Sequence, residues 1–190
     1  MKYSCMSFGK RSHRIELLHL NKPIKHGLAG MITSKLFKDA IAIVIDYREI
    51  NQTDYAFACF AVSQGNIGPR ILMTTQIFYD IKRGKPEART ILLHELGHYC
   101  HGDLETQNPN RDVERQMDAA IGKVSDAELR ADQFAAEYLG VTTVLQGLSN
   151  IKAMMSTQYA DYDEESLRVS LQEIDLRIAA LKSKQGMSQE

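Results

Sequence analysis

The spacing of apolar and polar residues divides the chain into a strand-like first half and a helical second half. Apolar, β-branched runs predict three strands, over residues 40–48, 55–63 and 70–75. Upstream of them, HRIELLHL (13–20) and GLAGMITSKLFKDA (27–40) are interpreted as short helices. The first half is therefore expected to form a small sheet preceded by a helical segment.

Helical spacing dominates from the last predicted strand onward. The stretch PEARTILLHELGHYCH (86–101) opens with a proline, which a first helical turn accepts, and Gly102 follows where helices commonly end. Three more helices are predicted, over residues 125–139, 143–155 and 165–183. A small, antiparallel-rich sheet followed by helices is an α+β fold.

Composition and charge are those of an ordinary globular protein, and no nucleic-acid partner is expected. The net charge is −1, although residues 1–38 carry eight Lys and Arg against Glu16 alone. That basic segment is interpreted as a solvated face, with contact to an anionic surface as the alternative. No run approaches the roughly 18 apolar residues of a membrane span. Three cysteines without framework spacing predict reduced thiols in a cytoplasmic protein.

The motif HELGH (94–98) is typical of a metal site. Residues four apart on a helix lie on one face, so His94 and His98 can direct two imidazoles at one ion. Glu95 projects to the side of that ion, where it can accept a proton from an attacking water without being a ligand. The alternative is a helix with satisfied surface histidines, and a third ligand would decide between the two.

The best candidate for the third ligand is Glu128, which lies 128 − 98 = 30 residues after His98. Asp132, one turn further along the same helix face, is expected to accept a hydrogen bond from a ligating histidine and so fix its orientation. Ser125 offers the alternative, because it also forms a capping box with Glu128, in which Glu128 binds no metal. His101 lies a turn beyond His98 and is poorly placed for the same ion.

Together, HELGH and the downstream pattern ELRADQFAA (128–136) resemble the gluzincin metallopeptidases. The likeness is to the family of CAAX-prenyl and heat-shock membrane proteases and their soluble minigluzincin relatives, and it covers about residues 55–155. It includes the helix that follows, LGVTTVLQGLSNI (139–151). The ImmA/IrrE family, which cleaves phage-type or stress repressors, is similar to nearly the same degree, but usually has Asn where this chain has Asp132.

The resemblance implies a zincin-like fold and roles for individual residues. One Zn²⁺ ion per chain would be held by His94, His98 and Glu128, with Glu95 as general base and Asp132 beside the ligands. An extended peptide substrate would pair with an edge strand formed by Ile71, Leu72, Met73 and Thr74.

Two departures from the family pattern change what it implies. The membrane helices of the family are missing, so no membrane substrate is implied. The family's histidine, six residues before an RI..L arginine, is Leu171 here, although RIAAL is present from Arg177. The oxyanion stabiliser is therefore expected to be Arg177 or a tyrosine, Tyr162 or Tyr159.

The sequence thus predicts a zinc-dependent endopeptidase that hydrolyses peptide or protein substrates by Glu95-assisted attack of water. A single metallopeptidase domain is expected over 1–190, with a basic helical N-terminal segment (1–38), a catalytic core (40–156) and a C-terminal helix (157–190). The alternatives are a site-specific regulatory protease of ImmA/IrrE type and a regulatory protein in which zinc only braces two helices. Retention of Glu95 counts against the last, since a structural site needs no base.

Overall fold

The described strands form one six-stranded mixed sheet in the order β1-β2-β3-β4-β6-β5. Their bounds are Tyr3–Phe8 (β1), Ile15–Leu20 (β2), Gly27–Ser34 (β3), Ile41–Ile45 (β4), Cys59–Gln64 (β5) and Ile67–Met73 (β6). Neighbouring strands are antiparallel except β4 and β6, which run parallel. The computed structural model describes residues 3–10, 14–22, 26–45, 59–64, 67–103, 117–158 and 164–187. Where they are described, the three predicted strands are confirmed as β4, β5 and β6.

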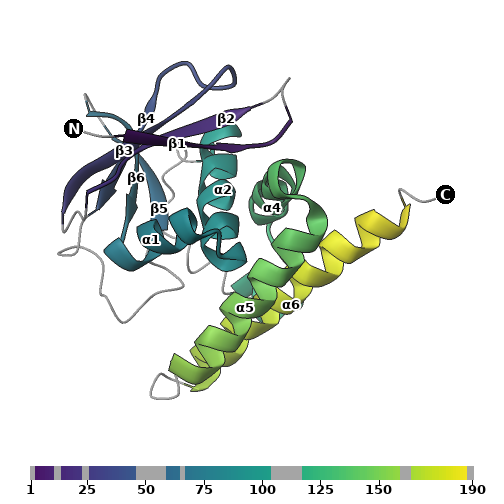
Figure 1. Cartoon of the computed structure of the whole chain (residues 1–190). Helices are drawn as coiled ribbons and strands as arrows, with labels where there is room; N and C mark the ends of the chain where they lie inside the picture. The colour runs from purple at the N-terminus through teal and green to yellow at the C-terminus, as the bar shows by residue number, and fades with distance from the viewer. Residues whose placement is uncertain are drawn as a thin grey trace.

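The helices follow the sheet and confirm the predicted α+β class. Those described are α1 (Thr75–Arg83), α2 (Pro86–Cys100), α4 (Asp126–Leu139), α5 (Val141–Gln158) and α6 (Glu164–Met187). Figure 1 shows α1 and α2 beside the sheet, α4 next to α2, and the long helices α5 and α6 side by side. The last four helices were predicted, whereas α1 was not predicted as a separate element. None of the described helices combines the length and the apolar character needed to cross a membrane.

The two helices predicted upstream of the sheet are wrong, because β2 and β3 occupy those stretches. In β2 the side chains of Ile15, Leu17 and His19 are buried, while Leu18 between them is exposed. An apolar residue on the outer face hides the alternation of a strand and imitates helical spacing. The expected helical segment over 1–38 is therefore replaced, in its described part, by three strands.

The strand expected to be a substrate edge lies inside the sheet. Both sides of β6 are paired, one to β4 in parallel and the other to β5 in antiparallel orientation. Thr74 comes after the strand and caps α1, where its hydroxyl accepts a hydrogen bond from the backbone N–H of Ile77 at 3.3 Å. The edge role expected for Ile71, Leu72, Met73 and Thr74 is therefore wrong. The edges of the described sheet are β1 and β5.

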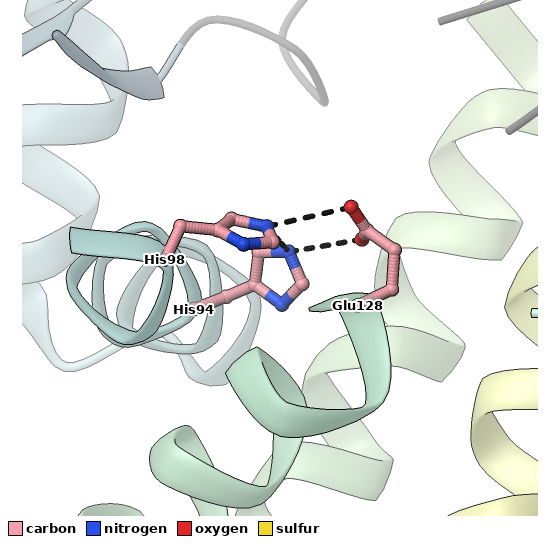
Figure 2. A group of neighbouring side chains, drawn as sticks. All are labelled: His94, His98 and Glu128. Carbon is pink, nitrogen blue, oxygen red and sulfur yellow. Dashed lines mark hydrogen bonds and ion pairs between the residues drawn. The ribbon is translucent and has the colours of Figure 1, made fainter. Parts of the chain in front are cut away.

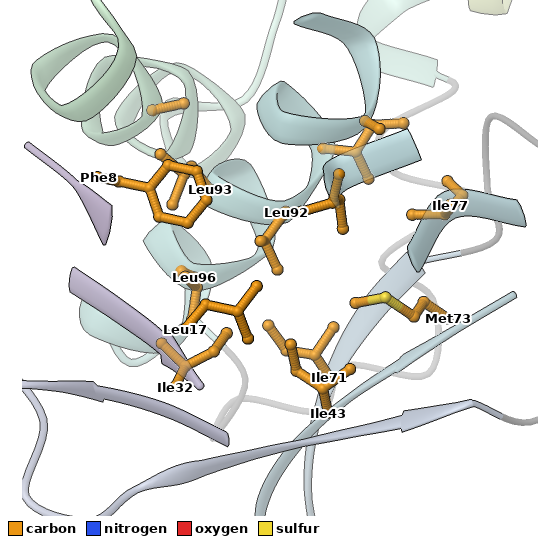
Figure 3. Close-up of a cluster of buried hydrophobic side chains, with 14 of the residues drawn as sticks. Phe8, Leu17, Ile32, Ile43, Ile71, Met73, Ile77, Leu92, Leu93 and Leu96 are labelled. Atoms are coloured by element: carbon orange, nitrogen blue, oxygen red, sulfur yellow. The ribbon is translucent and has the colours of Figure 1, made fainter. Parts of the chain in front are cut away.

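Helix α2 is buried against the sheet. Leu92, Leu93 and Leu96 have no exposed surface and belong to a core that extends from β1 to α6. Figure 3 shows the apolar side chains that meet there, including Phe8, Leu17, Ile32, Ile43, Ile71, Met73 and Ile77. Because α2 is anchored in this way, its remaining face is held in a fixed orientation toward α4.

The close contact between α2 and α4 depends on Gly97. A Cβ at this position would lie 2.8 Å from the Cα of Ala131 and 3.1 Å from the Cβ of Phe134, which is too close for either to remain in place. Ala131 and Ala135 are fully buried and keep α4 slim, as their small side chains predict. The two helices can therefore bring polar side chains from facing turns into direct contact.

Candidate metal centre

Helix α2 presents His94 and His98 one turn apart on one face, as the HELGH spacing predicts. Both side chains are buried, and their Nε2 atoms lie 3.0 Å apart. The two rings are almost perpendicular, at 89°. Figure 2 shows both rings directed toward the same small region. Two imidazole nitrogens this close repel each other through their lone pairs unless a proton or a cation lies between them.

Glu128 reaches this region from the first turn of α4. Its Oε2 lies 3.1 Å from the Nε2 of His94, and its Oε1 lies 3.4 Å from the Nε2 of His98 (Figure 2). Zinc bonds of about 2.0–2.1 Å in tetrahedral geometry separate neighbouring ligand atoms by about 3.3 Å. The distances among the three side chains fit this requirement. His94, His98 and Glu128 therefore form a buried group that could hold a metal ion.

Of the capping box expected between Ser125 and Glu128, the hydrogen bond to the Glu128 backbone is formed. Ser125 caps α4, and its hydroxyl accepts a hydrogen bond from the backbone N–H of Glu128 at 3.3 Å. The Glu128 side chain, however, points to the two imidazoles. Capping and participation in the site are thus compatible, because the first uses the amide and the second the carboxylate.

Asp132 lies where the sequence places it, one turn after Glu128 and against His94. Its Oδ1 is 2.8 Å from the Nδ1 of His94. Arg177, from α6, donates to both oxygens of Asp132, from Nε at 2.7 Å and from Nη2 at 2.6 Å. Its Nη1 also lies 3.4 Å from Oε2 of Glu128. Arg177 therefore connects the helix that carries Glu128 to the C-terminal helix.

Opposing charges determine protonation in this buried group. Burial raises the pKa of Asp132, but Arg177 and His94 outweigh burial and lower it to about 2. Burial also raises the pKa of Glu128, and His94 and Arg177 hold it well below its usual range. Burial and Arg177 lower the pKa of His94, yet Glu128 and Asp132 together raise it to about 9. Without a metal, the site thus favours a proton on His94, and a divalent cation would take that proton's place.

His98 has a carboxylate partner that the sequence reasoning missed. Oδ2 of Asp103 lies 3.1 Å from the Nδ1 of His98, and the Nη2 of Arg130 donates to Oδ1 of Asp103 at 2.9 Å. A signal was available in the sequence, because Gly102 ends α2 and turns the next residue back toward the helix. The same turn involves His101, whose Nδ1 faces the Gly97 carbonyl oxygen at 2.7 Å, outside the buried group.

Of the remaining predicted residues, some lie at the site and others lie outside the described residues. Glu95 is half-buried on α2 next to His94. Arg177 is at the site, but the contacts of its guanidinium with Asp132 and Glu128 favour positioning over the predicted oxyanion role, which stays a prediction. Tyr159 and Tyr162 lie outside the described residues.

The fold and the site define an α+β protein with a buried His-His-Glu group on two packed helices. The chain matches no protein-family model, no curated protein and no solved structure. What can be concluded about its chemistry therefore rests on the donor atoms and their geometry.

Proposed function

We propose that this protein is a zinc-dependent endopeptidase of the gluzincin kind, with His94, His98 and Glu128 as the metal ligands. The observation that carries the proposal is the set of distances among the donor atoms of three side chains from two helices, 3.0, 3.1 and 3.4 Å. Three protein ligands leave one position of a tetrahedral ion for water or substrate, as catalytic zinc sites do. A structural site would instead fill that position with protein.

The chain's own residues suit peptide hydrolysis at such a site. A bound zinc ion would supply Lewis acidity, which polarises a carbonyl group and lowers the pKa of water. Glu95, beside His94 on the same helix, would accept the proton of the attacking water and deliver it to the leaving amine. Asp132 would keep the Nδ1 of His94 occupied, so that Nε2 faces the ion.

An extended substrate needs a free strand edge, and β5 is our candidate for it. The strand predicted for this role, β6, is paired on both sides. β5 lies at one edge of the described sheet, and its backbone runs close to α2, the helix that carries the two histidines. A peptide added to β5 would gain main-chain hydrogen bonds beside the site.

Metal content tests the ligand set. We expect about one zinc per purified wild-type chain, and loss of that zinc in Glu128→Ala. Glu137→Ala is the matched control, because it makes the same substitution at an exposed position of the same helix. Zinc retained by Glu128→Ala would contradict the proposed third ligand and leave Glu128 as a helix cap only.

Cleavage of an unstructured protein such as casein tests the catalytic role. Glu95→Gln should keep its zinc and lose hydrolysis, because the amide cannot accept the proton. Equal cleavage by wild type and Glu95→Gln would contradict Glu95 as the base. A zinc-loaded wild type that leaves casein intact would contradict a general endopeptidase and favour the site-specific regulatory protease or the zinc-braced regulatory protein.

A further inference from the structure

We propose that Asp103 and Arg130 position His98 for metal binding, as Asp132 and Arg177 would position His94. The inference rests on the proposed metal centre and assigns it two residues that the HELGH and ExxAD patterns do not contain. It follows from the way the chain leaves helix α2.

The end of α2 is a Schellman motif that turns Asp103 back onto His98. The backbone N–H of Asp103 donates to the carbonyl oxygen of His98 at 3.0 Å, and that of Gly102 donates to Tyr99 at 3.2 Å. Gly102 has φ +72°, a conformation that disfavours residues with a Cβ. The turn thus fixes the Asp103 backbone to the same residue whose imidazole its side chain meets.

The side-chain contact leaves the metal-facing nitrogen of His98 available. Oδ2 of Asp103 is 3.1 Å from Nδ1, on the opposite side of the ring from the Nε2 that faces His94 and Glu128. A carboxylate at Nδ1 favours the tautomer with the proton on that atom, which leaves the Nε2 lone pair for a cation. It also limits rotation of the imidazole about its Cβ–Cγ bond.

Arg130 extends this arrangement to the helix that supplies the third ligand. It lies two residues after Glu128 on α4, and its guanidinium donates to the second oxygen of Asp103 at 2.9 Å. The pair therefore bridges the end of α2 and the start of α4 beside the group of three ligands. Arg130 is half exposed, so its contribution should be smaller than that of Asp103.

Zinc affinity, measured by competition with a chromophoric chelator, tests these roles. Asp103→Ala should weaken zinc binding about 10- to 100-fold, the range found when an outer partner of a ligating histidine is removed. Asp103→Asn should restore much of this loss, because its amide oxygen can still accept from Nδ1. Arg130→Met should weaken binding less than Asp103→Ala does. It should also have little further effect in the double variant, because its partner is already absent.

Thermal unfolding of the zinc-free proteins separates positioning from general damage. The matched control is Asp175→Ala, which removes the acid of another interhelical ion pair, Lys152–Asp175 at 2.6 Å between α5 and α6. We expect this control to bind zinc as wild type does. The zinc-free Asp103→Ala should unfold close to the wild-type temperature.

The outcomes distinguish this proposal from the one on which it rests. If wild type binds no zinc, both are overturned. If wild type binds zinc and Asp103→Ala binds it equally well, only the positioning role is overturned. A lower affinity that Asp103→Asn does not restore, together with an equally lowered unfolding temperature in both variants, would also overturn it in favour of a structural role for the turn.

Discussion

The two histidines of the site have the same kind of support but in different surroundings. Each faces an aspartate through Nδ1, and each aspartate contacts an arginine, in two groups: His94–Asp132–Arg177 and His98–Asp103–Arg130. In the first group the aspartate side chain has no exposed surface and the arginine side chain is 13% exposed. In the second, the corresponding values are 11% and 47%. The inner group is thus enclosed by three helices, whereas the outer group borders solvent.

This difference in exposure predicts that the Asp–Arg ion pairs of the two groups contribute differently to stability. A charge pair at the surface is weakened by water and salt, and is worth about 0–1 kcal/mol. In a buried pair, removal of one partner leaves the other charge without compensation. The inner group should therefore govern the stability of the fold around the site, and the outer group mainly the orientation of one ligand.

The largest effect is expected when Asp132 is removed. Asp132→Ala should lower the free energy of unfolding by about 3–5 kcal/mol, because the buried Arg177 would lose both of its hydrogen bonds to the carboxylate. Asp103→Ala should lower the free energy of unfolding by at most about 1 kcal/mol, because its ion pair with Arg130 borders solvent. Urea unfolding of the two zinc-free variants measures the difference.

A double variant identifies the cause of this loss. If the loss comes from the charge of Arg177, which would keep its longer 3.4 Å contact with Glu128 but lose Asp132, Asp132→Ala/Arg177→Met should be more stable than Asp132→Ala alone, since the buried guanidinium is then gone. If the double variant is no more stable than the single one, the loss comes from packing instead. In that case the contrast between the inner and outer groups would not be electrostatic.

A medium effect is expected at Gly97, which controls the spacing of the two helices. Gly97→Ala gains up to about 1 kcal/mol of helix propensity, but the new Cβ would overlap Ala131, and overpacking costs typically about 1–3 kcal/mol. Net destabilisation in urea is therefore expected. Separation of α2 from α4 should also weaken zinc binding, because Glu128 and Asp132 lie on α4.

The contact between Asp103 and His98 should be unaffected by Gly97→Ala. This contact is local to the end of α2, so a shift of α4 should leave it in place. Gly68→Ala is the control, since a Cβ there meets nothing within 4 Å. An unchanged stability and zinc affinity in Gly97→Ala would show that α4 accommodates the methyl group.

The sequence predicted the three candidate ligands and Asp132 better than Asp103 and Arg130 of the outer group, and the helices better than the first strands. His94, His98, Glu128 and Asp132 stand at helical spacings, and helical spacing maps directly onto a common face. Arg177 could be expected at the site only through the family resemblance. The hydrogen bonds of Arg177 to Asp132 depend on the packing of α6, which no local sequence pattern specifies.

The first strands were misread because long-range pairing decides their conformation. Leu18 is exposed opposite Met31 on the outer face of the sheet, and the two residues pair across β2 and β3. Apolar residues on both faces remove the alternation by which a strand is recognised. The position of β6 inside the sheet likewise follows from its parallel pairing with β4, which joins segments separated by β5 in the sequence.

A third buried histidine, His19, lies outside the site and can be compared with His94. Its substitution has the smallest expected effect. His19 is buried beside the Phe78 ring, and its Nδ1 lies 3.3 Å from the Leu20 carbonyl oxygen. Burial lowers the pKa of His19, and the nearby Lys82 lowers it further against the opposing hydrogen bond to Leu20. His94 is also buried, yet its pKa is raised. In the candidate metal centre the carboxylates of Glu128 and Asp132 thus outweigh burial and favour a positive charge.

This lowered pKa predicts a loss of stability in mild acid. The folded protein binds a proton at His19 less readily than the unfolded chain does, so His19 contributes stability above pH about 6.5. That contribution is lost as the pH falls toward the pKa of the folded state, with a slope that cannot exceed about 1.4 kcal/mol per pH unit. Urea unfolding of zinc-free wild type and His19→Gln between pH 7.5 and 5 should therefore show a smaller decline in the variant, and parallel curves would contradict the assignment. Because each variant is compared with wild type at every pH, the titration of His94 cancels, and the difference isolates a buried histidine that has no need to hold a cation.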